Sequence, residues 1–158
     1  MRTDIKRTAL NITTYCNLKC KHCLAFIPYY DKKFIMSIEE AGKILSAYFQ
    51  VVDSVEHFTV TGGEPLLNKD CAQILEEVHK YENQITGSVD FVTNGTMEIP
   101  DDIISVLAKH IDKTKVVLSN YGEKLSKKID IIEETLKQNG IPYRVSTVSY
   151  THLRAHET

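Results

Sequence analysis

The chain has 158 residues, of which 42% are hydrophobic and 25% are charged, and its formal net charge at pH 7 is −2. This composition is typical of a folded globular domain and excludes a disordered or collagen-like chain. The balanced charge, without a block of like charges, argues against a basic nucleic-acid-binding surface. No apolar run reaches the roughly 18 residues of a membrane span, and no signal peptide opens the sequence. We therefore expect a cytoplasmic protein that contacts neither a membrane nor nucleic acid.

Strand-like and helix-like segments alternate along the chain. We expect helices from residue 38 through at least 48 and over residues 68–81, 100–110 and 123–139, and strands over residues 8–13, 57–61, 88–93, 115–119 and from 143 onward. Ser37 and Glu40 form a capping box at the first helix, and Gly140 followed by Pro142 stops the last one. Alternation of this kind predicts an α/β fold with a parallel sheet and right-handed crossovers. At about 31 residues per unit of a TIM barrel, the sequence holds about four and a half βα units of a partial barrel.

Three of the four cysteines lie close together in the loop that follows the first expected strand. Cys16, Cys20 and Cys23 are spaced Cys-x3-Cys-x2-Cys, and Cys71 stands apart. The chain is too long and too poor in cysteine for a disulfide-stapled scaffold, so a metal or cluster site is the better interpretation. Four thiolates would close a 4Fe–4S cluster, whereas three leave one iron open for chemistry. We expect Cys71, near the start of the second helix, to be a small buried hydrophobic residue.

This cysteine motif resembles the cluster motif of radical S-adenosylmethionine (SAM) enzymes. Two further segments strengthen the resemblance: 62–65 matches the GGEP motif of that family, and 93–95 matches its TNG motif. Ser119 and Asn120, after the fourth expected strand, match positions that often line the SAM pocket. The motifs occur in order on successive loops that follow the strands. In a parallel α/β architecture, those loops are where chemistry is expected.

The resemblance implies a partial (βα)6-type, TIM-like barrel and two cofactors, a 4Fe–4S cluster and SAM. One electron from a low-potential donor of the flavodoxin or ferredoxin type would cleave SAM to methionine and a 5′-deoxyadenosyl radical. That radical would abstract a hydrogen atom from an unknown substrate, a peptide or a small molecule. Within the family, the cysteine segment looks most like peptide-modifying enzymes with auxiliary clusters and molybdopterin-precursor synthases. Glycyl-radical-enzyme activases are a rival.

The resemblance also assigns residues to roles. Cys16, Cys20 and Cys23 would ligate the cluster, and no catalytic acid or base is nominated. Glu64, or the carbonyl groups beside it, would accept hydrogen bonds from the SAM amino group, and Asn94 and Ser119 would make polar contacts to its ribose or carboxylate. Gly62 and Gly63 lack the Cβ that would block a close backbone approach, and Pro65 fixes the turn. The residues assigned to cofactor binding are Gly62, Gly63, Glu64, Pro65, Thr93, Asn94 and Ser119.

Two other interpretations stay open. The cysteines could belong to a zinc-binding module without catalysis, or the chain could be an inactive truncated fragment. His57, His79 and His110 are interpreted as surface or packing residues.

The last residues do not continue the pattern of strands and helices. Residues 148–158 resemble the translation of adapter DNA from transposase-based sequencing libraries. We therefore expect residues 1–146 to be a core domain truncated at its C-terminus and residues 147–158 to be a non-native tail. His152 and His156, four positions apart, are attributed to this tail and not to a metal site.

Overall fold

A computed structural model describes residues 2–21 and 23–148 of the chain. Of the interpreted tail, residues 147–158, the structure describes only Thr147 and Val148; residues 149–158, with His152 and His156, lie outside the described residues. The strands are β1 Asp4–Asn11, β2 Ser54–Thr61, β3 Ile85–Thr93, β4 Thr114–Asn120 and β5 Tyr143–Thr147. The helices are α1 Ile38–Val51, α2 Cys71–His79, α3 Asp101–Lys109 and α4 Ile129–Gln138, with short 3-10 turns at Ile27–Tyr29 and Pro65–Leu67.

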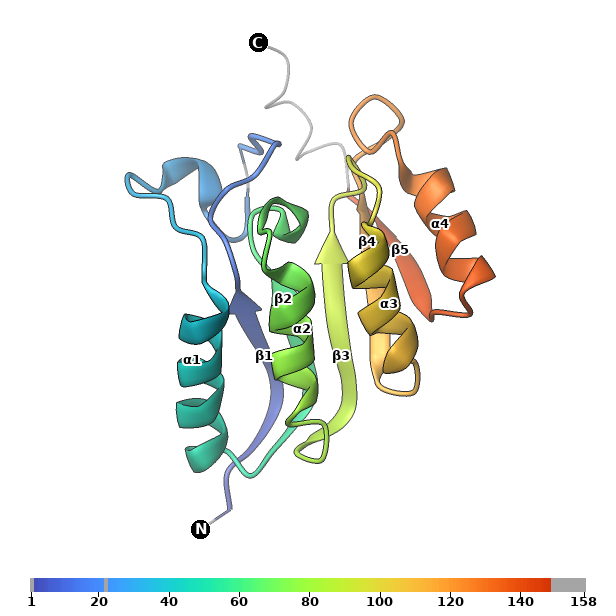
Figure 1. Ribbon diagram of the computed structural model, residues 1–158. Helices are drawn as coiled ribbons and strands as arrows, with labels where there is room; N and C mark the ends of the chain where they lie inside the picture. Colours follow the sequence, from blue (N-terminus) through green and yellow to red (C-terminus); the bar gives the residue numbers. More distant parts are fainter. Residues whose placement is uncertain (1, 22, 149–158) are drawn as a thin grey trace.

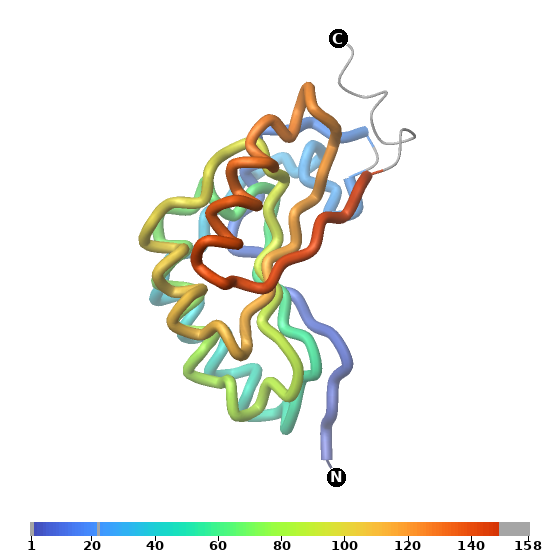
Figure 2. The backbone as a smooth tube through the Cα atoms, turned by 90° about the vertical axis from the view of Figure 1, so that its right-hand side faces the viewer, coloured from blue at the N-terminus to red at the C-terminus, as the bar shows by residue number. Residues whose placement is uncertain are grey.

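The five strands form one parallel sheet in sequence order, β1-β2-β3-β4-β5. A helix follows each of the first four strands, and the helices lie on one face of the sheet (Figures 1 and 2). The predicted α/β fold with four and a half βα units is therefore confirmed. Because the strands are parallel, their carboxyl ends meet at one edge, at the top of Figure 1. The loops that carry the sequence motifs gather there.

The core lies between the sheet and the helices. Val60, Phe91 and Leu118 from the strands pack with Ile74 and Leu75 of α2, and all five are fully buried. The predicted burial of Cys71 is confirmed. On the other face of the sheet, the neighbouring positions Thr59, Asp90 and Lys115 are polar and half-buried. The helix-covered face therefore supplies the apolar core.

The observed boundaries differ from the predicted ones where side chains close the turns. The first four strands begin earlier than expected, as in β1, which begins at Asp4 and not at residue 8, whereas β5 begins at Tyr143 as expected. The last helix begins at 129, not at 123, because the chain first turns at Gly122, whose φ is +91°. The hydroxyl of Ser126 then accepts a hydrogen bond from the Tyr121 amide at 2.9 Å and donates to the Asn94 carbonyl at 2.7 Å. Residues 123–128, which were predicted to begin the helix, therefore form a loop, and the Ser126 hydroxyl holds this loop against the end of β3.

The predicted capping box of α1 is confirmed. The Ser37 hydroxyl accepts a hydrogen bond from the Glu40 amide at 3.2 Å, and the Glu40 carboxylate accepts one from the Ser37 amide at 2.8 Å. In the described part of the chain, the helices are too short or too polar to span a membrane.

Candidate functional site

A cavity of about 330 Å³ lies at the carboxyl edge of the sheet. Its volume is at the lower end of the range typical of small-molecule sites. The three cysteines of the motif line it together with residues from the ends of β2, β3 and β4. Its lining includes Cys16, Cys20, Cys23, Gly62, Gly63, Thr93, Asn94, Ser119 and Tyr121. The structure thus brings together every residue assigned to the cluster or to cofactor binding except Glu64 and Pro65, which are buried outside the lining, and Asn120 is not part of the lining either.

The loop that carries the cysteines is anchored at both ends. The Ile12 carbonyl accepts a hydrogen bond from the Met36 amide at 2.9 Å, so the chain leaves and re-enters the fold at adjacent points. The buried Asn68 side chain donates to the carbonyls of Ile12 at 2.8 Å and Met36 at 2.9 Å. A buried amide with two partners of this kind fixes the base of the loop. The position of the cysteines is therefore set by β1 and by the segment before α2.

The cysteines form no disulfide within the described part of the chain, and their sulfur atoms contact residues of two other loops. The Cys16 sulfur accepts a hydrogen bond from the Leu18 amide at 3.4 Å and lies 3.9 Å from the Asn94 side-chain nitrogen. The Tyr121 hydroxyl hydrogen-bonds the Cys20 sulfur. Burial, together with the neighbouring thiols, raises the pKa of Cys20 to about 11. The thiol is therefore protonated near neutral pH, and a bound metal would have to displace that proton.

The spacing of the three sulfur atoms can be compared with that required by a single zinc ion. In a tetrahedral zinc site with Zn–S bonds of 2.3 Å, sulfur atoms lie about 3.8 Å apart. Among the described residues, only one trio of His, Cys, Asp or Glu side chains has its ligand atoms all within 4.8 Å of one another, and it does not include the cysteines. At least one pair of the three sulfur atoms therefore lies farther apart than 4.8 Å, which is wider than a single tetrahedral zinc ion requires. This spacing does not support the alternative of a zinc module.

Glu64 connects two of the motifs from behind the cavity. Its side chain is fully buried and accepts hydrogen bonds from the Leu66 amide at 3.1 Å, the Thr93 hydroxyl at 2.9 Å and the Asn94 amide at 2.8 Å. Burial raises the pKa of the Glu64 carboxyl, while the three donated hydrogen bonds favour its ionised form. The carboxylate therefore joins the end of β2 to the end of β3.

The two glycines before Glu64 allow the β2 loop to lie directly against the cysteine loop. The Gly63 amide donates to the Thr13 carbonyl at 2.8 Å, and the Glu64 amide donates to the Tyr15 carbonyl at 2.8 Å. A Cβ on Gly63 would lie 2.1 Å from the Tyr15 carbonyl oxygen, and one on Gly62 would lie 2.6 Å from that of Thr13. The close backbone approach predicted for these glycines is thus observed toward the cysteine loop.

Asn94 links the cysteine loop to the end of β3. Its side-chain nitrogen donates to the Asn17 side-chain oxygen at 2.9 Å, and its own oxygen accepts from the Thr96 amide at 3.0 Å. Gly95, which follows, has a φ of +68°, and a Cβ there would meet the Ile129 side chain at 2.3 Å. The turn after β3 therefore needs glycine on two grounds, its left-handed conformation and its packing against α4.

Sequence reasoning missed two residues that shape the site. Tyr121 lies directly after Ser119 and Asn120 at the carboxyl end of β4, and this position alone could have identified it. Asn68 is predicted at the start of a helix, whereas it precedes α2 and holds the base of the cysteine loop. The sequence gives no sign of the second role, because both partners are carbonyl groups far away along the chain.

Several solved structures are similar in fold to this chain. The chain is similar to SuiB from Streptococcus suis bound to S-adenosylmethionine, with a TM-score of 0.72 and 18% identity over 96% of this chain and 37% of that one. It is also similar to anSMEcpe with bound AdoMet, with a TM-score of 0.67 and 19% identity over 90% of this chain and 43% of that one. At these identities, the likeness establishes the fold.

Sequence relatives include GTP 3′,8-cyclases. That of Campylobacter jejuni subsp. doylei is 26% identical over 131 residues, which make up 80% of this chain and 40% of the relative. A probable GTP 3′,8-cyclase of Methanococcus vannielii is 33% identical over 94 residues, 60% of this chain and 30% of the relative. The chain thus spans less than half the length of these curated relatives.

A family model described as the Radical SAM superfamily matches residues 10–119. The matched range contains the three cysteines, both loop motifs and Ser119. The cofactors of this superfamily are a 4Fe–4S cluster and SAM, and the three cysteine thiols that line the cavity are ligands of the kind that such a cluster takes. Because the match covers more than half of the sequence, the chain belongs to the radical SAM superfamily.

Proposed function

We propose that this chain forms the cluster- and SAM-binding part of a radical SAM enzyme. Cys16, Cys20 and Cys23 would each ligate one iron of a 4Fe–4S cluster, and the adjoining cavity would hold SAM. The observation that carries the proposal is that the three thiols and the ends of β2, β3 and β4 line one cavity. When bound, this pair of cofactors supplies one-electron reductive cleavage of SAM and abstraction of a hydrogen atom from a substrate.

The chain's own residues would bind, orient and shield these groups. The Asn94 side-chain nitrogen and the Tyr121 hydroxyl are donors directed at the sulfurs of Cys16 and Cys20, respectively. Hydrogen bonds to the sulfur ligands tune the potential of an iron–sulfur cluster. Gly62, Gly63, Thr93 and Ser119 would contact SAM from the carboxyl ends of three strands.

Glu64 and Pro65 have a different part in this proposal. They lie behind the lining of the cavity, and the three hydrogen bonds to the Glu64 carboxylate come from protein groups. We assign them to holding the loops after β2 and β3 in register, as positioning residues. We still propose that the backbone carbonyl groups beside Glu64 accept hydrogen bonds from the SAM amino group.

Anaerobic reconstitution of the full chain with iron and sulfide tests the cluster assignment. About four iron and four sulfide per chain are expected, with an electron paramagnetic resonance signal that changes when SAM is added. Cys20→Ala should lose this cluster, whereas Cys71→Ala is the matched control and should keep it. A full, SAM-responsive cluster in Cys20→Ala would overturn the assignment. One tightly bound zinc ion that is lost in Cys20→Ala, with no colour, would favour the zinc module instead.

The electron donor is proposed to be a low-potential flavodoxin or ferredoxin. The reconstituted chain should form 5′-deoxyadenosine from SAM when either protein is supplied in its reduced form, and the Cys20→Ala variant should not. Formation with chemical reductant but with neither protein donor would argue against this class of partner.

For the substrate we propose a nucleotide, in line with the GTP 3′,8-cyclases among the sequence relatives. A peptide is the competing class, since one similar structure is described as SuiB bound to the precursor peptide SuiA. GTP should raise the yield of 5′-deoxyadenosine from the reconstituted chain more than ATP or a peptide does. A rise with peptide alone would remove the nucleotide proposal while leaving the cluster assignment intact.

A further inference from the structure

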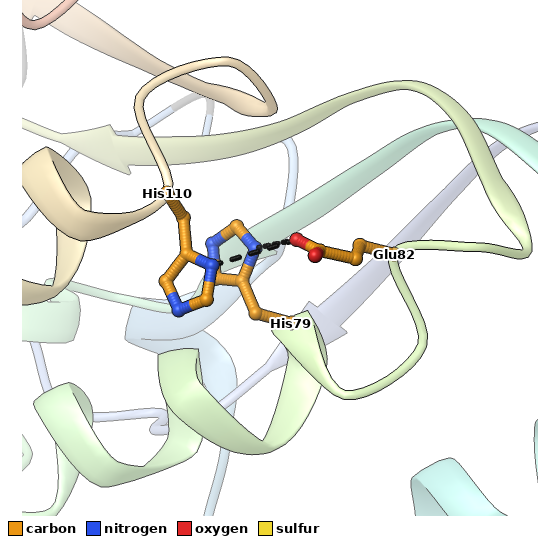
Figure 3. A group of neighbouring side chains, drawn as sticks. All are labelled: His79, Glu82 and His110. Atoms are coloured by element: carbon orange, nitrogen blue, oxygen red, sulfur yellow. Dashed lines mark ion pairs between the residues drawn. The ribbon is translucent and has the colours of Figure 1, made fainter.

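A second group of metal-ligating side chains lies at the opposite edge of the sheet from the cavity. His79 is the last residue of α2, Glu82 lies in the turn before β3, and His110 directly follows α3. Figure 3 shows the two imidazole rings stacked, with the Glu82 carboxylate beside them. The ring centroids are 4.0 Å apart and the planes differ by 6°. The interpretation of His79 and His110 as surface or packing residues is consistent with this stacking, but it did not foresee that the fold brings the two together.

Three ligand atoms converge within this group. The Glu82 Oε2 atom lies 3.4 Å from His110 Nδ1 and 3.6 Å from His79 Nδ1. Two ligands bound to one ion at about 2.1 Å in tetrahedral geometry lie about 3.4 Å apart. Among the described residues, this is the only trio of His, Cys, Asp or Glu side chains whose ligand atoms all lie within 4.8 Å of one another. The spacing suits a single ion once the stacked rings rotate to direct both Nδ1 lone pairs at it.

The His79 Nδ1 atom gives independent evidence for a ligand. The His79 side chain is 1% exposed, and Nδ1 is buried without a hydrogen-bond partner. Buried polar atoms without a partner are rare and costly, and an ion is one of the groups that resolve them. Glu82 is 41% exposed and His110 15%, so an ion could reach this buried nitrogen from the Glu82 side.

In each imidazole the Nε2 atom has a hydrogen-bond partner, which leaves the Nδ1 atom free to bind an ion. His110 Nε2 lies 3.1 Å from a Glu76 carboxylate oxygen, and His79 Nε2 lies 3.3 Å from the Thr114 hydroxyl. When the Nε2–H groups donate to these oxygens, the lone pairs are on the Nδ1 atoms. A carboxylate that holds the far side of a ligating histidine is a recurrent feature of protein metal sites.

We propose that His79 Nδ1, His110 Nδ1 and Glu82 Oε2 form a binding site for a divalent transition metal ion of the zinc class. Two imidazole nitrogens and one carboxylate oxygen suit that class. Water would complete the coordination on the exposed side, beside Glu82. The ion would connect the end of α2, the turn before β3 and the end of α3, far from the cluster cavity. The site would therefore stabilise the fold independently of the proposed radical chemistry.

The test uses the full chain with Cys16, Cys20 and Cys23 all changed to Ser, so that thiolates do not compete for zinc. Zinc is titrated against a chromogenic chelator, and the melting temperature is measured with and without zinc. We expect one zinc ion per chain and a higher melting temperature, since an ion that binds the folded state stabilises it. Glu82→Gln and His110→Gln should each weaken zinc binding by about 10-fold or more, and Glu76→Gln should weaken it by at least about 10-fold through loss of its hold on His110.

The matched control is His57→Gln. His57 also lies beside a glutamate, with its Nε2 atom 3.5 Å from Glu56, but it is elsewhere on the sheet. This variant should bind zinc unchanged. Circular dichroism confirms that each variant is folded, and because the buried His79 is left in place, loss of packing does not confuse the result. Absence of zinc binding in the cysteine-free chain, or binding that survives both Glu82→Gln and His110→Gln, would overturn the proposal.

Discussion

The Asn94 backbone amide donates a hydrogen bond to the Glu64 carboxylate across 2.8 Å, which connects the segment after β2 to the segment after β3. The same carboxylate also accepts from Thr93 and Leu66. Two sequence motifs that lie about thirty residues apart are thus one hydrogen-bonded unit. The cavity lining therefore depends on a residue that does not face the cavity.

Replacing Glu64 by Ala should strongly destabilise the chain. The amides of Leu66 and Asn94 and the hydroxyl of Thr93 would all lose their acceptor in a buried region. At about 1–3 kcal/mol for each unpaired buried donor, the free energy of unfolding should fall by about 3 kcal/mol or more. Urea unfolding measures this change. Glu39→Ala is the control, because its exposed ion pair with Lys43 should contribute less than about 1 kcal/mol. Equal effects of the two substitutions would contradict the role given to Glu64.

Replacing Gly63 by Ala should damage the cysteine loop. The new Cβ would lie 2.1 Å from the Tyr15 carbonyl oxygen, and backbone cannot move aside as a flexible side chain can. Forced overpacking of this kind costs about 1–3 kcal/mol, and we expect iron incorporation to drop to less than about half. Iron content after reconstitution and urea unfolding are the measurements. Gly42→Ala is the control, because its Cβ would meet nothing closer than 3.8 Å and alanine favours the helix. A Gly63→Ala chain with full iron content and unchanged stability would refute this interpretation.

Replacing Asn68 by Ala should loosen the base of the cysteine loop. Its side chain donates to Ile12 and Met36 and accepts from the Asp70 amide at 2.9 Å. The loss of these buried hydrogen bonds should cost about 2–4 kcal/mol and raise the rate of proteolysis within residues 13–35. Asn139→Ala removes an exposed side-chain hydrogen bond and should change stability by less than about 1 kcal/mol. Protection of the loop equal to that of the unaltered chain would count against the anchoring role.

Replacing Tyr121 by Phe should alter the cluster rather than the fold. The substitution keeps the ring but removes the hydroxyl that hydrogen-bonds Cys20. Loss of a hydrogen bond to a cluster ligand should make the reduction potential more negative, on the order of tens of millivolts. Redox titration of the reconstituted chain measures it. Tyr143→Phe loses a hydroxyl contact to Glu133 that does not involve the cysteines, and it should leave the potential unchanged. An unchanged potential in Tyr121→Phe would rule out this contribution of Tyr121.

The local pattern of the sequence is sufficient to predict the order of the elements and the edge at which the site lies. Alternating strands and amphipathic helices determine a parallel sheet, and a parallel sheet brings the carboxyl ends of its strands together. The three cysteines, Gly62, Gly63 and Asn94 can therefore be placed near one another from their positions along the chain alone. Helix starts are predicted less well, because Asn68 and Ser126 use their side chains to close turns instead of extending the helices.

The tertiary structure decided which contacts those residues make. It directed the Glu64 carboxylate toward the amides of the next loop, and it placed Tyr121 against Cys20. It also brought His79, Glu82 and His110 together, although His110 comes about thirty residues after the other two. Such groupings depend on how helices pack across a sheet and on the hydrogen bonds that loops form far along the chain. Local periodicity is enough to predict the order of strands and helices, whereas these long-range contacts form only when the chain folds.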